Sequence, residues 1–165
     1  MRKRRYIFDS VCLSNFVQAE ASDILAVRYK SRAFISSEVL DELSSAVPCY
    51  PRLRSVEHLI DSSVFQLTTL TRQEHMRFTE LICYLGKGES SCIAMAKQRK
   101  MTVVTDDKAA RNTCRQLNVP VTGTIGILKS SCIDHQLSVQ DADSILAKMI
   151  GNGYYAPVQR ISDIV

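Results

Sequence analysis

The sequence predicts an α/β fold with three layers (α/β/α), in which helices cover both faces of a parallel central sheet. Short apolar segments rich in β-branched and aromatic residues alternate along the chain with longer segments of helical periodicity. Two of the apolar segments, 6–8 and 102–105, run directly into acidic residues, which is typical of the carboxyl ends of parallel strands. The length of 165 residues favours a single domain over residues 1–165.

The first half of the chain contains three predicted strands and the helices that connect them. The strands are short apolar runs at residues 6–8, 33–35 and 64–67. Periodicity and capping residues predict helices at residues 14–20, 23–29, from Ser36 or Ser37 onward, and 52–61. Pro48 and Pro51 separate the last two of these helices.

The second half continues the alternation. A capping box at Thr71 and Glu74 predicts a helix to about Leu85, which Gly86-Lys-Gly88 interrupts. Two more strands are predicted at residues 102–105 and 119–122. The remaining helices are predicted at residues 89–100, 108–117, from 125 onward, and, after a capping box at Ser138, to 149.

Composition and charge describe an ordinary globular chain. Hydrophobic residues make up 45% and charged residues 23%, and no apolar run is long enough to span a bilayer. The basic start is not followed by an apolar stretch of signal-peptide length, so we expect a cytoplasmic protein. The four cations from Arg2 to Arg5 equal the net charge of +4 and form either a solvated terminus or a basic arm for phosphates.

The six cysteines and three histidines do not indicate a metal site. No Cys-x-x-Cys pair occurs, and no cysteine stands at zinc-ligand spacing from a histidine, so we expect small buried thiols. The chain also lacks a nucleophile elbow, a Walker loop and a Gly-x-Gly-x-x-Gly motif after its first strand. These absences argue against the common serine hydrolase and nucleotide-binding classes.

Acidic residues occupy four separated places where the pattern predicts strand ends or helix starts: Asp9, Glu42, Glu89 and the pair Asp106/Asp107. Carboxylates from distant parts of a chain repel one another when a fold gathers them, and a divalent cation is the usual compensation. Mg²⁺ and Mn²⁺ prefer oxygen ligands and activate water for attack on phosphodiesters. The pattern therefore predicts a carboxylate metal site for phosphate chemistry.

Each of these acids also has a purely structural alternative. Asp9 can cap the helix after the first strand, and one of Asp106 and Asp107 can cap the helix that follows them. Glu42 can belong to a solvated helix surface, and Glu89 can be stabilised by the dipole of its helix. The sequence does not decide between the structural and the metal-binding roles.

Four segments together resemble the PIN-domain family of metal-dependent ribonucleases. These segments are Tyr6 to Ser10, Val39 to Leu43, Gly86 to Glu89, and Val103 to Asp107. Two more segments, 119–126 and 151–154, resemble the PIN subgroup known only as a domain of unknown function, which is similar to the VapC-like toxins of VapBC-type toxin–antitoxin pairs. The resemblance spans nearly the whole chain and implies a PIN-like fold.

The resemblance also implies an endoribonuclease that hydrolyses RNA with Mg²⁺ or Mn²⁺. At the matching positions, the catalytic and metal-binding residues are Asp9, Glu42, Glu89, Asp106 and Asp107, with the last two as alternatives. Three nearby cations are either phosphate contacts or ordinary surface charges, namely Lys87, Lys108 and Arg111. The chain has no Trp and few aromatic residues, so we expect RNA recognition to depend on shape and backbone contacts.

Finally, the resemblance implies the toxin of a type II toxin–antitoxin pair, with a homodimeric assembly and a small antitoxin partner. A pair of helices at 57–61 and 72–85 is a candidate contact surface, although core packing explains the same apolar residues. The alternative is a catalytically silent PIN-like module that binds RNA or protein on the same fold.

Overall fold

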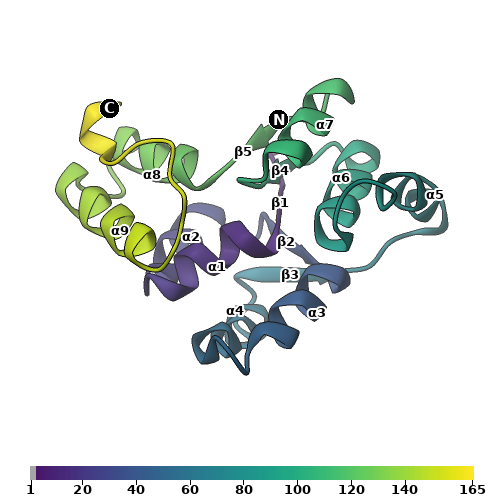
Figure 1. The fold of residues 1–165 in the computed structure, drawn as a ribbon, viewed down its shortest axis with the longest axis horizontal. Coiled ribbons are helices and arrows are strands. Elements are labelled where there is room, and N and C mark those ends of the chain that lie inside the picture. Colours follow the sequence, from purple (N-terminus) through teal and green to yellow (C-terminus); the bar gives the residue numbers. More distant parts are fainter. Residues whose placement is uncertain (1–2) are drawn as a thin grey trace.

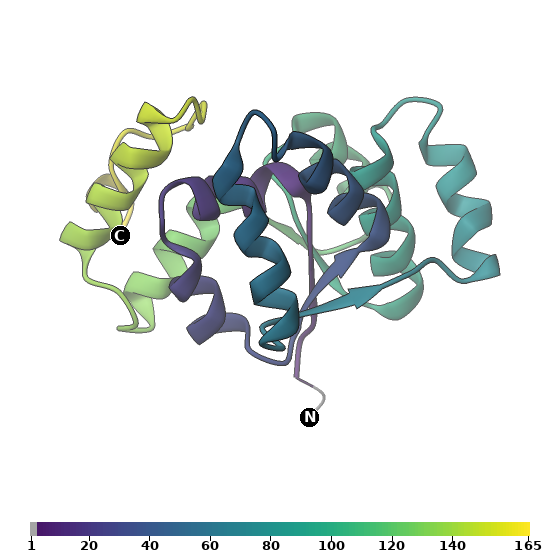
Figure 2. The ribbon, with the colours of Figure 1, turned by 90° about the horizontal axis from the view of Figure 1, so that it is seen from below.

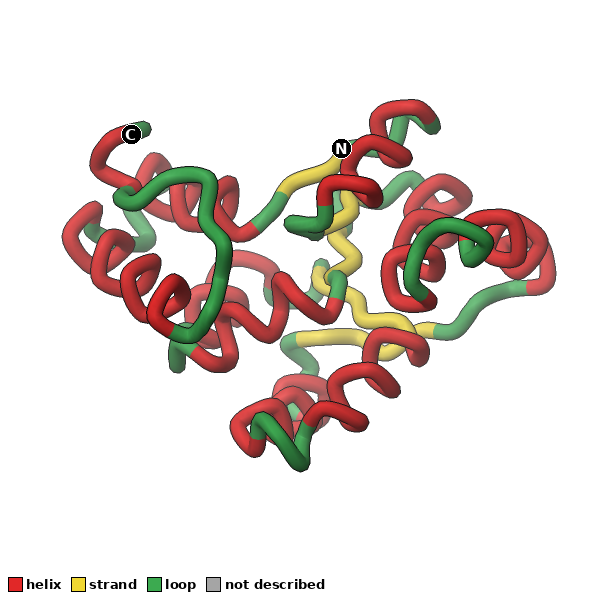
Figure 3. Tube along the Cα trace, viewed as in Figure 1, coloured by secondary structure: helices red, strands yellow, loops and turns green. Residues whose placement is uncertain are grey.

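A five-stranded parallel sheet lies at the centre of the computed structural model, which describes residues 3–165. Its strand order is β3-β2-β1-β4-β5, and every neighbouring pair is parallel. The strands are β1 (Tyr6–Phe8), β2 (Ala33–Ser36), β3 (Phe65–Thr68), β4 (Thr102–Val104) and β5 (Val121–Thr122). The strands run through the middle of the molecule, surrounded by helices (Figures 1 and 3).

Helices enclose this sheet on both sides, which confirms the predicted three-layer α/β class (Figures 1 and 2). α1, α2, α8 and α9 lie on one side of the strands, α5, α6 and α7 lie on the other, and α3 and α4 lie near β3 (Figure 1). The helix bounds are α1 (Ser10–Gln18), α2 (Ser22–Tyr29), α3 (Ser37–Ala46), α4 (Ser55–Asp61), α5 (Arg72–Leu81), α6 (Lys87–Arg99), α7 (Lys108–Gln116), α8 (Thr124–Ile133) and α9 (Val139–Gly151). Two short 3₁₀ helices are η1 (Pro51–Arg54) and η2 (Ile161–Asp163). Among residues 3–165, no helix combines the length and the apolar character needed to cross a membrane.

The strand order changes direction at β1. The chain adds β2 and β3 on one side of β1 and then returns to place β4 on the other side. Phe8 pairs with Val104, and the Asp9 amide donates a hydrogen bond to the Val104 carbonyl at 2.9 Å. The residues that follow β1 and β4 are therefore held side by side at the switch point, where parallel α/β sheets usually bind ligands.

Small side chains allow α6 to pack closely against the centre of the sheet. Every residue from Ser90 to Ala96 is buried, and α6 contacts β1, β2 and β4. The Cys92 thiol contacts the Phe8 carbonyl at 3.5 Å, so the helix and β1 approach each other closely. The buried free thiols are those of Cys12, Cys92, Cys114 and Cys132. The other two free cysteines, Cys49 and Cys83, are exposed, so the prediction of buried thiols is correct for only part of the set.

Several helix boundaries differ from the sequence predictions. α1 begins at Ser10 rather than at residue 14, since the Asp9 side chain caps it directly after β1. α5 ends at Leu81 rather than near residue 85. α6 begins at Lys87, so Gly88 lies inside its first turn instead of interrupting the helix. A glycine in a helix lowers local helix propensity, but packing in the fold overrides that preference.

The predicted basic arm lies partly outside the described residues, since Arg2 is not among them. Lys3 and Arg4 are exposed at the start of the described chain. Arg5 donates a hydrogen bond to the Arg99 carbonyl at 2.6 Å. This contact lies before β1, whereas Asp9 follows the carboxyl end of the same strand (Figure 2). The described part of the basic arm therefore lies at the amino ends of the strands, whereas the acidic residues lie at their carboxyl ends.

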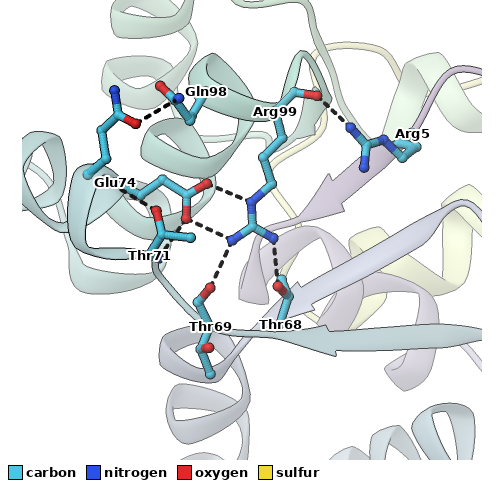
Figure 4. A network of polar contacts seen from close by, with 8 residues as sticks. Arg5, Thr68, Thr69, Thr71, Glu74, Gln98 and Arg99 are labelled. Carbon is cyan, nitrogen blue, oxygen red and sulfur yellow. Dashed lines mark hydrogen bonds and ion pairs between the residues drawn. The ribbon is translucent and has the colours of Figure 1, made fainter.

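One ion pair connects α5 to the end of α6 and to the strand β3 (Figure 4). The Arg99 guanidinium donates to both Glu74 oxygens, at 2.6 and 2.7 Å, and also contacts Thr68 and the Thr69 carbonyl. The Glu74 side chain is almost completely buried, and it also accepts from the Thr71 amide in a capping box. Burial acts to raise the pKa of Glu74, but the hydrogen bonds from Arg99 and Thr71 outweigh that effect and lower the pKa below its usual value.

Replacing Arg99 by Met should destabilise the protein by about 3 kcal/mol, because the Glu74 carboxylate then stays buried without its cationic partner. Methionine keeps most of the aliphatic packing of the arginine side chain, so the loss reports on the charge. Urea unfolding followed by circular dichroism measures the change.

The matched control is Arg52→Met, which breaks an ion pair with Glu20 whose two side chains are 58% and 65% exposed. That exposed pair should contribute less than about 1 kcal/mol. Equal effects of the two substitutions would contradict the structural role assigned to Arg99.

Candidate active site

A cavity of about 580 Å³ opens beside the switch point of the sheet. Four predicted site residues line it, namely Glu42, Glu89, Asp106 and Asp107. We call this cavity the acidic pocket. Ser10 and Lys108, the first residues of α1 and α7, also line it. The structure thus brings carboxylates from α3, α6 and the β4–α7 connection to one place.

Asp9 lies fully buried at the start of α1, next to the residues that line the pocket. Its Oδ1 accepts a hydrogen bond from the Ser10 amide at 2.7 Å, and its Oδ2 accepts one from the Thr105 hydroxyl at 2.9 Å. Burial, followed by the negative charge of Glu89 and a smaller effect of Glu42, raises the pKa of Asp9 to about 7. The Asp9 side chain therefore caps α1 and is also destabilised as a charged group by burial and by neighbouring acids. Its capping role does not exclude a role in the site.

Glu42 is held in place by α1 and α6. Its Oε1 accepts from the Gly88 amide at 2.9 Å, and its Oε2 accepts from the Ser10 hydroxyl at 2.7 Å. A Cβ atom at Gly88 would come within 2.5 Å of Glu42 Oε2, so only glycine permits this approach. Glu42 is thus fixed toward the pocket and is not a freely solvated helix residue.

Glu89 occupies the first turn of α6 and is partly buried. Burial, together with the charges of Asp107 and Glu42, raises its pKa above the usual range. A carboxylate near a helix N-terminus is normally stabilised in its charged form. The upward shift shows that desolvation and the neighbouring acids outweigh this effect at Glu89.

The two adjacent aspartates have different surroundings. Asp106 Oδ1 accepts from the Thr124 amide at 2.9 Å, and Oδ2 accepts from the Thr124 hydroxyl and from the Asn15 amide group. Asp107 Oδ1 accepts from the Ala110 amide at 2.7 Å and caps α7. Both oxygens of Asp106 are therefore occupied by donors, whereas Asp107 uses one oxygen as a cap and acts electrostatically on Glu89.

No ion pair in the described part of the chain involves any of these five acids; the pairs found there join other residues. Arg111 donates to the Thr105 carbonyl at 2.9 Å. Lys108 lines the pocket, and Lys87 is exposed at the start of α6. The described residues therefore leave the repulsion among the acids without a direct ion pair.

The acids share a pocket, but they do not form a compact set of ligands. Within residues 3–165, no group of three or more His, Cys, Asp or Glu side chains is arranged to hold a metal ion. The donor chemistry nevertheless suits a hard divalent cation, because the site offers carboxylate oxygens, and burial together with neighbouring negative charge raises the pKa values of Asp9 and Glu89.

Sequence reasoning did not find three contributors to this site. Asn15 and Thr124 hold Asp106, and the Gly88 amide holds Glu42. Nothing in the local pattern marks Asn15, which donates to Asp106 and to Thr124 across more than 90 residues of sequence. The glycines beside Thr124 are the signal in the sequence that could have indicated this contact. Gly123 lies so close to Asp106 that a Cβ atom at this position would come within 2.4 Å of Asp106 Oδ1.

Residues 5–165 match the sequence model of the family DUF3368, which is described as a PIN domain. The chain belongs to this PIN-domain family. The family resemblance inferred from the motifs is therefore confirmed over almost the entire length of the protein. No curated protein sequence matches the chain.

Two solved structures share the fold of this PIN domain. A chain in the crystal structure of FitAcB from Neisseria gonorrhoeae is 15% identical, with a TM-score of 0.52, over 70% of this chain and 95% of that chain. A chain in the structure of VapBC2 from Rickettsia felis, bound to a DNA fragment from their promoter, is also 15% identical, with a TM-score of 0.52, over 72% of this chain and 97% of that chain. At this level of identity the similarity supports the fold.

The buried Asp9 should make the stability of the metal-free PIN domain dependent on pH. Its pKa of about 7 in the folded state exceeds the ordinary value of 3.8, so the folded chain binds a proton that the unfolded chain has released. The free energy of unfolding should therefore fall as pH rises, by roughly 2 to 3 kcal/mol between about pH 5 and about pH 8. Urea unfolding in a chelator at several pH values measures this slope.

The variant Asp9→Asn should lose most of this pH dependence and be more stable than the wild type above neutral pH. Asn remains a good N-cap, so α1 should stay intact. Asp41→Asn, which changes an exposed carboxylate of the same α3 as Glu42, should keep the wild-type slope. If the free energy of unfolding changed with pH equally in the wild type and in Asp9→Asn, the pKa of Asp9 would not be raised in the folded state.

Proposed function

We propose that this PIN domain is a metal-dependent endoribonuclease that hydrolyses RNA phosphodiester bonds. One observation carries the proposal: acids from four separate parts of the chain meet at the switch point, where burial and the neighbouring charges raise the pKa values of Asp9 and Glu89. Such repulsion costs stability, and a divalent cation bound among the carboxylates would offset it. The family membership supports the same activity class.

Asp9, Glu42, Glu89 and Asp107 are the residues that would hold Mg²⁺ or Mn²⁺. A divalent ion, when bound there, supplies the Lewis acid that polarises a phosphodiester and activates water. Asp106 is the less suitable direct ligand, because Thr124 and Asn15 already donate to both of its oxygens. We assign to Asp106 the positioning of the β4–α7 connection that carries Asp107.

Hydroxyl groups fix the orientation of these carboxylates. Thr105 donates to Asp9 and accepts from the Asp107 amide, so one side chain orients residues after both β1 and β4. Ser10 connects α1 to Glu42. Lys108 lines the pocket and is placed to contact a phosphate of the substrate.

We further propose that the protein is the toxin of a type II pair, works in the cytoplasm as a homodimer of single-domain chains, and binds a small antitoxin. The VapC-like resemblance and the fold shared with chains of the FitAcB and VapBC2 structures support this role. The helix pair suggested as a contact surface does not form, because α4 packs on η1 and β3 while α5 packs on α6. α5 and the residues after it expose Met76, Ile82 and Tyr84, which makes this region the better candidate.

Purified protein should cleave single-stranded RNA in the presence of Mn²⁺, and Asp9→Asn or Asp107→Asn should reduce cleavage more than about a hundredfold. Both substitutions remove a carboxylate charge while retaining a residue that caps a helix. A fluorescently labelled RNA resolved on a denaturing gel measures the rate.

Asp41→Asn is the matched control, since it removes an exposed carboxylate from the same helix as Glu42 and should cleave like the wild type. Undiminished cutting by Asp9→Asn would refute the site assignment. A wild-type protein that binds RNA but never cuts it would instead favour the catalytically silent binding module.

Expression of the wild-type protein in a bacterium should slow growth if the protein is a toxin, and Asp9→Asn should relieve the inhibition. The reason is that loss of the carboxylate removes the site that the proposed cleavage requires. Growth curves after induction, with protein levels matched on immunoblots, test this. Equal inhibition by the wild type and Asp9→Asn would indicate toxicity unrelated to the acidic pocket.

A further inference from the structure

Two exposed tyrosines stand at the acidic pocket, and we propose that they bind the bases of single-stranded RNA. Tyr50 and Tyr155 both line the cavity that contains the carboxylates. Their exposed fractions are 56% and 96%, respectively, so each presents an aromatic face to the solvent. This inference rests on the proposed nuclease function and adds to it a way in which the substrate is held.

The two tyrosines come from distant segments that meet at the end of α1. Tyr50 directly precedes η1, and Tyr155 follows α9. Arg52 and Asn152, one from each segment, both donate a hydrogen bond to the Gln18 carbonyl, at 3.5 and 3.1 Å. The two segments are thereby fastened to the same residue, and both tyrosines line the pocket.

The backbone beside each tyrosine is well fixed. The Tyr50 amide donates to the Ala46 carbonyl at 2.9 Å, and the Tyr154 amide donates to the Met149 carbonyl at 3.0 Å. Tyr154 itself is half-buried and lines the same pocket. Its burial and its backbone hydrogen bond hold the segment, so Tyr155 projects from a held backbone.

The chemistry of the rim suits single-stranded nucleic acid. Each base offers a flat face to an aromatic ring, and such stacking contributes about 1–3 kcal/mol per base without demanding a particular sequence. Lys108 in the pocket supplies positive charge for the backbone between stacked bases. A base-paired duplex keeps its bases stacked on one another and offers no free faces, so the arrangement favours unpaired RNA.

This proposal departs from an expectation from composition. The small number of aromatic residues suggested recognition by shape and backbone alone, but the fold gathers Tyr50, Tyr154 and Tyr155 at the one pocket that carries the acids. A third strongly exposed tyrosine, Tyr84, is 62% exposed and lies between α5 and α6. Because α5 and α9 lie at opposite ends of the molecule, Tyr84 provides a matched control (Figures 1 and 2).

Binding of a fluorescein-labelled oligouridine, measured by anisotropy in a chelator so that no cleavage occurs, tests the proposal. Tyr50→Leu and Tyr155→Leu should each weaken binding by about five- to thirtyfold, which corresponds to the loss of one stacked base. Tyr50→Phe and Tyr155→Phe retain the ring and should bind within about twofold of the wild type. Tyr84→Leu should bind like the wild type.

A second probe with abasic riboses keeps the phosphates and removes the bases. On this probe, the Leu variants should bind as the wild type does, since no base remains to stack. Wild-type affinity for oligouridine in both Leu variants, equal losses on the abasic probe, or no measurable binding by the wild type would each overturn the proposal.

The cleavage assay separates this result from the nuclease proposal. Tyrosine-dependent binding by a protein that does not cut RNA with Mn²⁺ would support the stacking residues and reject the nuclease. Cutting that is unchanged in both Leu variants, together with their normal binding, would reject the stacking residues and leave the nuclease.

Discussion

The repulsion among carboxylates at the switch point of the sheet is the constraint around which this PIN domain is arranged. Asp9 is fully buried at the end of β1, and it lies close enough to Glu89 and Glu42 that their charges raise its pKa further above the shift caused by burial. Desolvating a carboxylate next to other acids costs free energy, and among the described residues no ion pair offsets that cost. The remainder of the fold has to hold these groups together against their repulsion.

The fold does so with backbone amides and hydroxyl groups. The Gly88 amide and the Ser10 hydroxyl hold Glu42, the Thr105 hydroxyl holds Asp9, and helix α7 is capped by Asp107. Neutral donors orient a carboxylate without cancelling its charge, so the site stays available to a cation. The ion pair between Arg99 and Glu74 is the contrasting case. There a cation neutralises the charge of a buried carboxylate, and the pair connects α5, α6 and β3.

Under the proposed function, the acidic pocket serves two kinds of contact. Its carboxylates come from α3, from α6 and from the β4–α7 connection, while its tyrosines come from the segments after α3 and α9. Chemistry needs ligands held to within a fraction of an ångström, and side chains on helices and at strand ends provide this better than side chains on loops. Base stacking tolerates more variation, since any flat aromatic face at the rim suffices.

Local sequence determined the α/β class, the order of the elements and the identity of the five acids, because alternation of apolar periods and strand-terminal acids are short-range patterns. The partners of Asp106 and the meeting at Gln18 of the segments that carry Tyr50 and Tyr155 depend on long-range contacts. The two partners of such a contact are far apart in the sequence, so hydrophobic periodicity, which is a local pattern, does not predict the contact. The sequence by itself therefore determined which chemical groups this protein carries. Only the tertiary structure decided which of them face one another, because burial and charge repulsion act through space and not along the chain.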